Sequence, residues 1–322
     1  MRRIAATAIV FGLLAAPAAA EAPRGWRPDV AAARAWAAQR TGDVSFAVRT
    51  EQRAWSWRAT TSYRSASVVK AMLLVAYLRR ADVRPRALRA GERALLDPMI
   101  RRSDNRAADA VHARVGLPAL RALARRAGMR SFVAHPVWGG SLVTAGDQAR
   151  FFLRIDRLVP ARHRADAMGL LRGVVTGQRW GIAAALPAGW EIAFKGGWGR
   201  GATRQVDHQA ALLTNAGLRV SVAVLTADNP SDGYGAATLQ GVAARLLRGL
   251  AGTVTGAVVR SRAGLGGLRA SARRVDVIPD QPGNSEAPVC TPFGPPVDGA
   301  LNTQSTFWTL GIGCAASRMM RR

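Results

Sequence analysis

The spacing of apolar residues predicts strands near both ends of the chain and helices between them. Alternating apolar and polar positions indicate strands, whereas apolar positions that recur every three or four residues indicate helices. The predicted strands cover residues 44–49, 54–58, 190–196, 205–214 and 219–226. The predicted helices cover residues 29–40, 67–81, 92–102, 107–114, 118–127, 145–158, 162–175 and 236–250. This order predicts an α+β fold, in which one antiparallel sheet is flanked by the terminal helices and an all-helical lobe is inserted.

The two ends of the chain differ in texture from the middle. Residues 1–20 have a basic start, an apolar run and small residues at cleavage spacing, which is typical of a signal peptide. Residues 251–322 are rich in Gly, Pro, Ser and Arg and lose periodicity, so we expect a mobile tail. Cys290 and Cys314 both lie in this tail and are candidates for one disulfide. The folded domain is therefore expected at residues 21–250.

The charge of the chain indicates the class of its partners. Its 322 residues carry a formal net charge of +26. A basic exported protein should attract anionic cell-wall polymers, membrane surfaces or carboxylate substrates. Aromatic and basic residues do not interleave as in nucleic-acid binders, and the four histidines lack metal-ligand spacing. We therefore expect a monomer outside the cytoplasm, secreted or in the periplasm or cell envelope. It should have no membrane span after cleavage, no nucleic-acid partner, no metal and no cofactor.

Lysine is nearly absent from this chain. Of 46 basic residues only Lys70 and Lys195 are lysine. A guanidinium keeps its proton in a protein, whereas a buried amine can act as a base. Ser67 lies three residues before Lys70 at the start of an apolar helix, so the two side chains share a face. We expect a nucleophilic Ser67 within hydrogen-bond reach of Lys70. An N-cap serine beside a surface lysine is the structural alternative.

Two further motifs follow in order. Ser-Asp-Asn stands at 103–105 after a predicted helix, and Lys-Gly-Gly stands at 195–197 on the first strand after the helical lobe. With Ser-x-x-Lys at 67–70, they resemble the Ser-x-x-Lys, Ser-Asp-Asn and Lys-Thr-Gly signature of the penicillin-recognising serine hydrolases. The similarity is closest to class A β-lactamases and covers about residues 28–250, so the resemblance implies the β-lactamase/transpeptidase fold.

The resemblance implies catalytic roles for three residues. Ser67 would attack an amide carbonyl, and Lys70 would take its proton. Ser103 would pass a proton to the leaving nitrogen. The N–H groups of Ser67 and Trp198 would form the oxyanion hole.

It also implies a substrate-binding set, formed by Asn105, Lys195, Gly197, Trp198 and Arg204. Asn105 would bind the substrate's amide side chain and Lys70, while Lys195 and Arg204 would hold a carboxylate. Arg204 has an alternative as one more surface arginine, and Asp104 is expected to be a buried structural acceptor.

The chain also departs from the class A pattern. That family carries a Glu-x-x-Leu-Asn loop whose glutamate activates the deacylating water, yet residues 106–194 contain no asparagine and residues 134–140 are too few to replace the loop. Gly196 stands where the third motif has threonine. Acylation is therefore expected and fast deacylation is not, unless His135 serves as a substitute base.

Three functions follow from this pattern. The leading one is an exported serine hydrolase that acts on β-lactams or related amides, with antibiotic resistance or β-lactam catabolism as its setting. The second is a D,D-peptidase that acts on peptidoglycan peptides, as penicillin-binding proteins do. The third is a non-catalytic basic protein that binds the cell wall.

Overall fold

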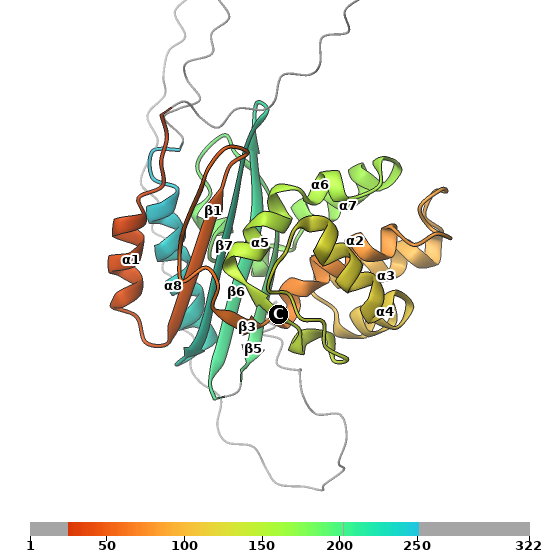
Figure 1. Cartoon of the computed structure of the whole chain (residues 1–322), viewed down its shortest axis with the longest axis horizontal. Coiled ribbons are helices and arrows are strands. Elements are labelled where there is room, and N and C mark those ends of the chain that lie inside the picture. Colours follow the sequence, from red (N-terminus) through yellow and green to blue (C-terminus); the bar gives the residue numbers. More distant parts are fainter. Residues whose placement is uncertain (1–24, 202, 251–322) are drawn as a thin grey trace, which may run out of the picture. The chain divides into compact units, whose positions relative to one another are not determined.

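A five-stranded antiparallel sheet forms the centre of the fold (Figure 1). The structure is a computed structural model that describes residues 25–201 and 203–250, so the predicted signal peptide, the tail and both cysteines lie outside the described residues. The strand order is β2-β1-β7-β6-β5. The strands are β1 (Asp43–Arg49), β2 (Ala54–Trp57), β5 (Glu191–Arg200), β6 (Gln205–Asn215) and β7 (Leu218–Asn229). A separate pair joins β3 (Ser62–Arg64) to β4 (Leu142–Thr144).

Helices cover both faces of the sheet. The two terminal helices α1 and α8 pack together on one face, and α5 packs against β1, β6 and β7 on the other (Figure 1). The remaining helices form a lobe centred on α2, which contacts α3 and α4. The helices are α1 (Val30–Ala38), α2 (Lys70–Leu78), α3 (Ala90–Arg101), α4 (Asn105–Ala127), α5 (Ala145–Leu153), α6 (Ile155–Leu158), α7 (Arg164–Arg172) and α8 (Asp232–Leu246). The predicted α+β architecture, with its inserted helical lobe, is confirmed.

The local differences from the predicted elements have simple causes. The two helices predicted on either side of Gly116 are one element bent at that residue, whose φ of 72° and ψ of 165° are not helical. The helix predicted over 145–158 is broken at Arg154 into α5 and α6. The strands β3 and β4 were not predicted because three residues are too few to show a period.

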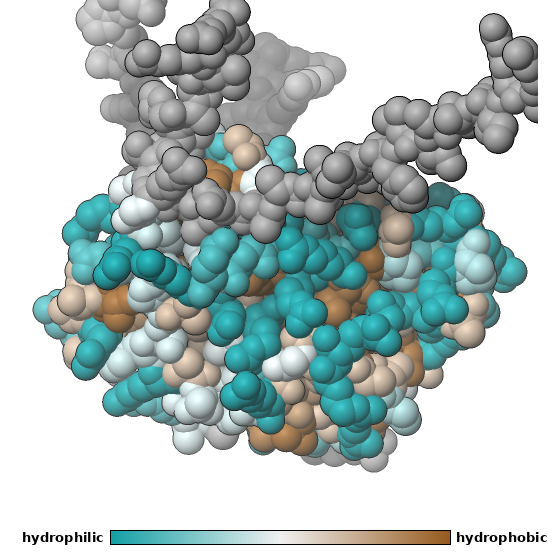
Figure 2. All heavy atoms as spheres, turned by 45° about the horizontal axis from the view of Figure 1, so that its top comes forward, coloured by the Kyte–Doolittle hydropathy of each residue, from teal (hydrophilic) through white to brown (hydrophobic). Residues whose placement is uncertain are grey.

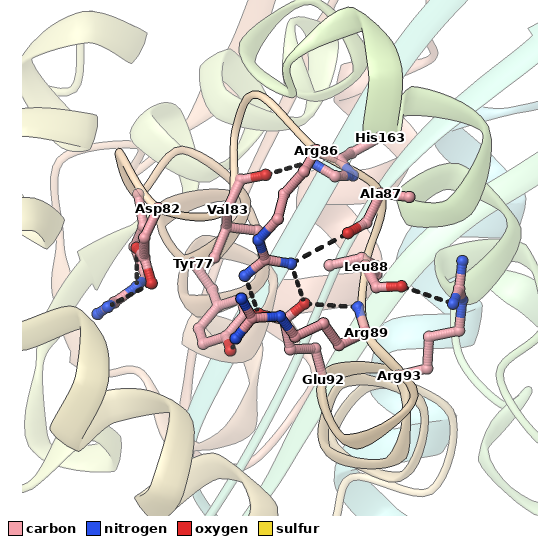
Figure 3. Close-up of polar contacts among 11 residues, drawn as sticks. Tyr77, Asp82, Val83, Arg86, Ala87, Leu88, Arg89, Glu92, Arg93 and His163 are labelled. Carbon is pink, nitrogen blue, oxygen red and sulfur yellow. Dashed lines mark hydrogen bonds and ion pairs between the residues drawn. The ribbon is translucent and has the colours of Figure 1, made fainter.

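Polar contacts hold the short connection between α2 and α3 (Figure 3). The side chain of Glu92 accepts from the N–H of Arg89 at 2.7 Å, which caps α3, and it also binds both terminal nitrogens of Arg86. The buried ring of His163 donates from Nε2 to the carbonyl of Val83 in the same connection, at 3.1 Å. These contacts fix the start of α3, and Ser103 follows directly after the end of that helix.

The surface of the described part is strongly polar. Figure 2 shows hydrophilic side chains over most of one face, with apolar residues in smaller patches between them. In residues 25–201 and 203–250, no helix has both the length and the apolar character that crossing a bilayer requires.

A buried carboxyl on β6 should make stability fall as pH rises. Burial, reinforced by the charge of Asp232, raises the pKa of Asp207 to about 8. The folded state therefore binds this proton more tightly than the unfolded state does. The stabilisation is complete below about pH 4 and is lost as pH rises through about 8, with a slope of up to about 1.4 kcal/mol per pH unit. Asp207→Asn is expected to flatten this part of the curve in urea unfolding between pH 4 and 8.

The exposed Asp166 offers a matched control for that measurement. Other groups also titrate between pH 4 and 8, so the prediction concerns the difference between variants in the slope of unfolding free energy against pH. Asp166→Asn should leave the slope of the wild-type curve unchanged. A slope in Asp207→Asn equal to that of wild type would show that Asp207 is ionised in the folded protein at pH 4 to 8.

Candidate active site

The first motif lies at the entry to the most buried helix of the lobe. All nine residues of α2 are buried, as expected for a helix that is apolar all round. Ser67 precedes it in a 3₁₀ turn, Ala66–Val69, and is partly exposed. The turn is held from behind, because the N–H of Ser65 donates to the carbonyl of Ser141 at 2.7 Å. Ala66 has a φ of 43°, a left-handed conformation that is strained for a non-glycine residue.

The amine of Lys70 is fully buried and holds the second motif. Nζ donates to the backbone carbonyl of Ser103 at 2.5 Å, to Oδ1 of Asn105 at 2.8 Å and to Oγ of Ser103 at 3.3 Å. Among the described residues it makes no hydrogen bond with Oγ of Ser67, so the expected direct bond is not formed. The reason is that Ser103 and Asn105 already engage all three donors of the ammonium group. Apo catalytic contacts are often longer than those in substrate complexes.

Ser103 joins the two lysines of the chain. The Nζ of Lys195, also fully buried, donates to Oγ of Ser103 at 3.1 Å and to the carbonyl of Gly196 at 2.8 Å. Ser103 has a φ of 60°, which is uncommon outside glycine and points to a constrained turn. One hydroxyl thus bridges two buried amines that are 125 residues apart in the sequence. Lys70, Ser103 and Lys195 therefore lie together in the structure.

Burial makes both amines lose their protons more readily than a solvated lysine does. It lowers the pKa of Lys70 to about 7, against the opposing effect of the Asp104 and Asp109 carboxylates. Burial, and secondly the charge of Lys70, hold the pKa of Lys195 well below its usual value. Two cations this close in a dry site resist simultaneous charging. A substrate carboxylate entering beside Lys195 would favour its charged form and raise its pKa.

Strand β5 meets the turn of Ser67 at Gly197. A Cβ atom placed there would lie 2.7 Å from the backbone nitrogen of Ser67 and 2.6 Å from that of Val68. Only glycine allows this approach, which brings the strand segment before Trp198 onto the turn that contains Ser67. The sequence placed Gly197 in the substrate-binding set, and the structure shows why the position needs glycine.

Replacing Gly197 by alanine is therefore expected to separate β5 from the Ser67 turn. Overpacking of this kind costs about 1–3 kcal/mol, so the free energy of unfolding should fall by that amount in a urea titration. Any reaction at Ser67 should slow at the same time. Gly196→Ala is the matched control, because its Cβ would meet Trp180 at 3.6 Å, an ordinary contact. Equal stability of the two variants would contradict the tight approach at Gly197.

Trp138 covers Lys70 from the side of the 134–140 loop and was not singled out from the sequence. Its ring centroid lies 4.7 Å from Nζ of Lys70, and its Nε1 donates to Oδ1 of Asp109 at 2.7 Å. Oγ of Ser65 donates to its carbonyl at 3.2 Å. Its only signal in the sequence was its place in the short segment 134–140. An indole therefore lies beside the amine of Lys70, and no carboxylate among the described residues accepts a hydrogen bond from this amine.

The structure does not bring Arg204 to this cluster. The predicted strand ended at residue 196, but β5 continues to Arg200, which pairs with Gln205. Arg204 therefore lies exposed in the turn, more than about 16 Å along the hairpin from Lys195. Asp104 is exposed rather than buried, although it is the acceptor that was predicted: it caps α4 by accepting from the N–H of Ala107 at 2.7 Å.

Other expected positions also have defined surroundings. The ring of Trp198 packs edge-on against Trp180 with centroids 5.8 Å apart, which forms an aromatic wall beside Gly196. His135 is exposed, and its Nδ1 accepts from the N–H of Val137 at 3.0 Å. No hydrogen bond in the described ranges ties His135 to Ser67 or Lys70. Those ranges also contain no group of three or more His, Cys, Asp or Glu residues arranged to hold a metal ion.

Comparison with known proteins finds solved structures of the same fold. The β-lactamase from Sphaerobacter thermophilus superposes with a TM-score of 0.60 at 20% identity, covering 71% of this chain and 99% of its own. A class A β-lactamase representative from Bacteroides cellulosilyticus gives a TM-score of 0.61 at 14% identity, covering 72% and 99%. A β-lactamase from Desulfarculus baarsii gives 0.53 at 24% identity, covering 67% and 96%.

These structural likenesses establish the fold. No curated protein sequence matches the chain. The profile of the β-lactamase enzyme family matches residues 87–250, half of the chain and most of the folded part. This region includes the second and third motifs, and the first motif spans the 3₁₀ turn and the first residue of α2, a helix that packs against α3 and α4. The chain therefore belongs to the β-lactamase enzyme family and is a hydrolase of that type.

Proposed function

We propose that the protein is an exported serine hydrolase of the class A type that is acylated at Ser67 by β-lactams or related amides. The observation that carries the proposal is the hydrogen-bonded chain Lys70–Ser103–Lys195, with both amines fully buried. Buried lysines without a carboxylate partner are costly, and perturbed groups that converge in this way are typical of functional sites.

The residues suggest an order of proton transfers. Neutral Lys70 takes the proton of Ser67 while Oγ forms a bond to the substrate carbonyl carbon. The N–H groups of Ser67 and Trp198 would stabilise the resulting oxyanion. The C–N bond then breaks, and Ser103 gives its proton to the leaving nitrogen and is reprotonated by Lys70. Lys195, charged when a substrate carboxylate is beside it, would anchor that carboxylate.

Deacylation should be slow. Release of the acyl group needs a base that activates water near Ser67. The described residues offer the indole of Trp138 beside Lys70, whereas His135 is exposed and held by its own loop. We therefore propose a long-lived acyl-enzyme. His135→Ala should leave the steady-state turnover of a chromogenic cephalosporin unchanged, and a lower rate would restore the histidine as the base.

Intact-mass spectrometry after incubation with benzylpenicillin tests acylation directly. The expected result is one adduct of the mass of the whole penicillin, located on Ser67 by peptide mapping and absent from Ser67→Ala. The adduct should persist after removal of free drug. Absence of an adduct in folded wild-type protein would reject the proposal and leave the non-catalytic, basic cell-wall binding protein as the better reading.

A D,D-peptidase acting on peptidoglycan peptides is the second candidate function. The indole of Trp138 lies beside Lys70 and cannot activate water, so the β-lactam acyl-enzyme should deacylate slowly. Penicillin-binding peptidases react with β-lactams in this way, which favours the peptidase function. Release of D-alanine from a peptide ending in D-Ala-D-Ala would support this function. Turnover of a cephalosporin without such release would support the β-lactamase function.

Export is part of the proposal and rests on the first residues and on charge. The basic start and apolar run of residues 1–20 have the pattern of a cleaved signal, and a net charge of +26 suits contact with anionic cell-wall polymers. Recovery of the protein from the culture medium or periplasm, with an N-terminus after Ala20 or Ala22, would support it. An intact Met1 on protein recovered from the cytoplasm would contradict it.

A further inference from the structure

A cavity lies away from the Ser67 site, toward the opposite edge of the sheet. It has a volume of about 270 Å³ and is lined by the ends of β1 and β2, by residues 130 and 131, and by the start of α5. Strand β2 is one edge of the sheet with β1 beside it, and β5, which contains Lys195, is the opposite edge. The charged residues that line this cavity are Arg49, Arg130, Arg150 and Asp147.

The single carboxylate of this cavity is already engaged. Asp147 is buried and accepts from the backbone N–H groups of Arg130 at 2.9 Å and Ser131 at 2.7 Å. It also forms an ion pair with Arg150 at 2.9 Å. A carboxylate with three such donors has little capacity left for a second guanidinium. One positive charge of the three is therefore neutralised within the cavity.

Arg49 and Arg130 keep their charges without partners. Within the described ranges, neither guanidinium makes a hydrogen bond or an ion pair. Arg49 is half-buried on β1, and its pKa is lowered first by burial and then by the charges of Arg150 and Arg130. The three guanidinium groups thus repel one another, although a guanidinium remains protonated in a protein. Positive charge that is concentrated in this way is stabilised by an anion.

We propose that this cavity binds a phosphate group in its dianionic form, as inorganic phosphate or a small phosphomonoester. Three arginines and one aspartate leave a net charge of +2 at the cavity, which a phosphomonoester of charge −1.5 to −2 at pH 7 balances. Guanidinium groups bind phosphate oxygens bidentately. The volume is below the usual 300–1,000 Å³ of pockets for drug-sized ligands, which favours a small headgroup.

The exposed hydroxyls of Ser56 and Thr60 border the same cavity and can donate to further phosphate oxygens. A bound phosphate would join β1 and β2 to the start of α5, which are separate segments of the chain. Binding to the folded state alone should therefore stabilise the protein. The proposal does not depend on the chemistry at Ser67.

Thermal unfolding and ³¹P NMR of the full chain test this site. Phosphate and phenyl phosphate are titrated into wild type at pH 7.5, with sodium chloride adjusted to hold ionic strength constant. At saturation we expect a rise in melting temperature of about 5 °C or more and broadening of the ³¹P signal. Both effects should weaken as pH falls below about 6, where the monoester dianion takes up one proton and becomes a monoanion. Equal rises with chloride and with phosphate would overturn the proposal.

Two variants and a control locate the effect. Arg49→Gln and Arg130→Gln should each lower the apparent affinity for phosphate at least tenfold, as judged from the phosphate concentration that raises the melting temperature. Arg34→Gln removes an exposed arginine of α1 and should leave the shift unchanged. Since Arg130 is exposed, its variant should fold even if Arg49→Gln does not. Equal affinity in Arg130→Gln and Arg34→Gln would show that phosphate binds elsewhere, and a larger response to phenyl phosphate than to phosphate would favour an organic monoester.

Discussion

Replacing Lys70 by arginine is expected to lower the rate of Ser67 acylation by about 10²–10⁴-fold. The variant keeps a positive charge at the site, but a guanidinium does not release its proton and so cannot accept one from Ser67. In wild type the acylation rate should rise as pH increases through about 7, because the pKa of Lys70 is about 7 and the neutral amine is the base. Stopped-flow acylation by a chromogenic cephalosporin between pH 5 and 9 measures both effects.

The larger size of arginine must be separated from its inability to accept a proton in that experiment, since the side chain of Lys70 is fully buried. Lys70→Met has a similar length and no charge, and it should also lose the pH-dependent rise. Circular dichroism and melting temperature then show whether each variant is folded. Retention of a rate within tenfold of wild type, with the same pH dependence, in either folded variant would exclude Lys70 as the base.

Much of this fold could be predicted because its elements are long and regular. The strands of the hairpin and of the final three-stranded meander alternate over enough residues to show their period, and Gly128 ends α4 in the left-handed conformation typical of a helix C-terminus. The candidate site residues could be predicted for a different reason. In a chain that otherwise uses arginine, Lys70 and Lys195 stand out, and the structure brings both to Ser103.

The site residues that the sequence misplaced or missed depend on strand register and on contacts between distant residues, and neither can be seen in a pattern along the chain. The resemblance gave Arg204 a role in holding the substrate carboxylate, but the register of β5 against β6 places that residue in the turn. The end of a strand is set by its partner's hydrogen bonds as well as by its own residues. Trp138 escaped notice because its contact with Lys70 crosses 68 positions of the chain, and an aromatic residue in a loop has no local pattern.

Ser103→Ala is expected to reduce acylation by about 10²–10³-fold, and the loss should depend on the leaving nitrogen. The backbone carbonyl of Ser103 holds Lys70 at 2.5 Å and remains in the variant, as does the bond from Lys70 to Asn105. Lys70 therefore stays in place, and only the hydroxyl that links it to Lys195 is removed. A leaving nitrogen of low basicity can leave with less help from a proton donor, so the substitution should slow acylation by such a substrate less.

The measurement compares acylation by benzylpenicillin and by an N-sulfonated monocyclic β-lactam, whose sulfonate lowers the basicity of the ring nitrogen. The ratio of wild-type to variant rates should be larger for benzylpenicillin. Ser56→Ala, on the exposed side of β2, should change neither rate. If Ser103 only positions Lys70 and Lys195, both substrates will slow by the same factor, because loss of positioning affects the attack step and not the fate of the nitrogen. A difference between the two substrates thus separates proton delivery from support of the two amines.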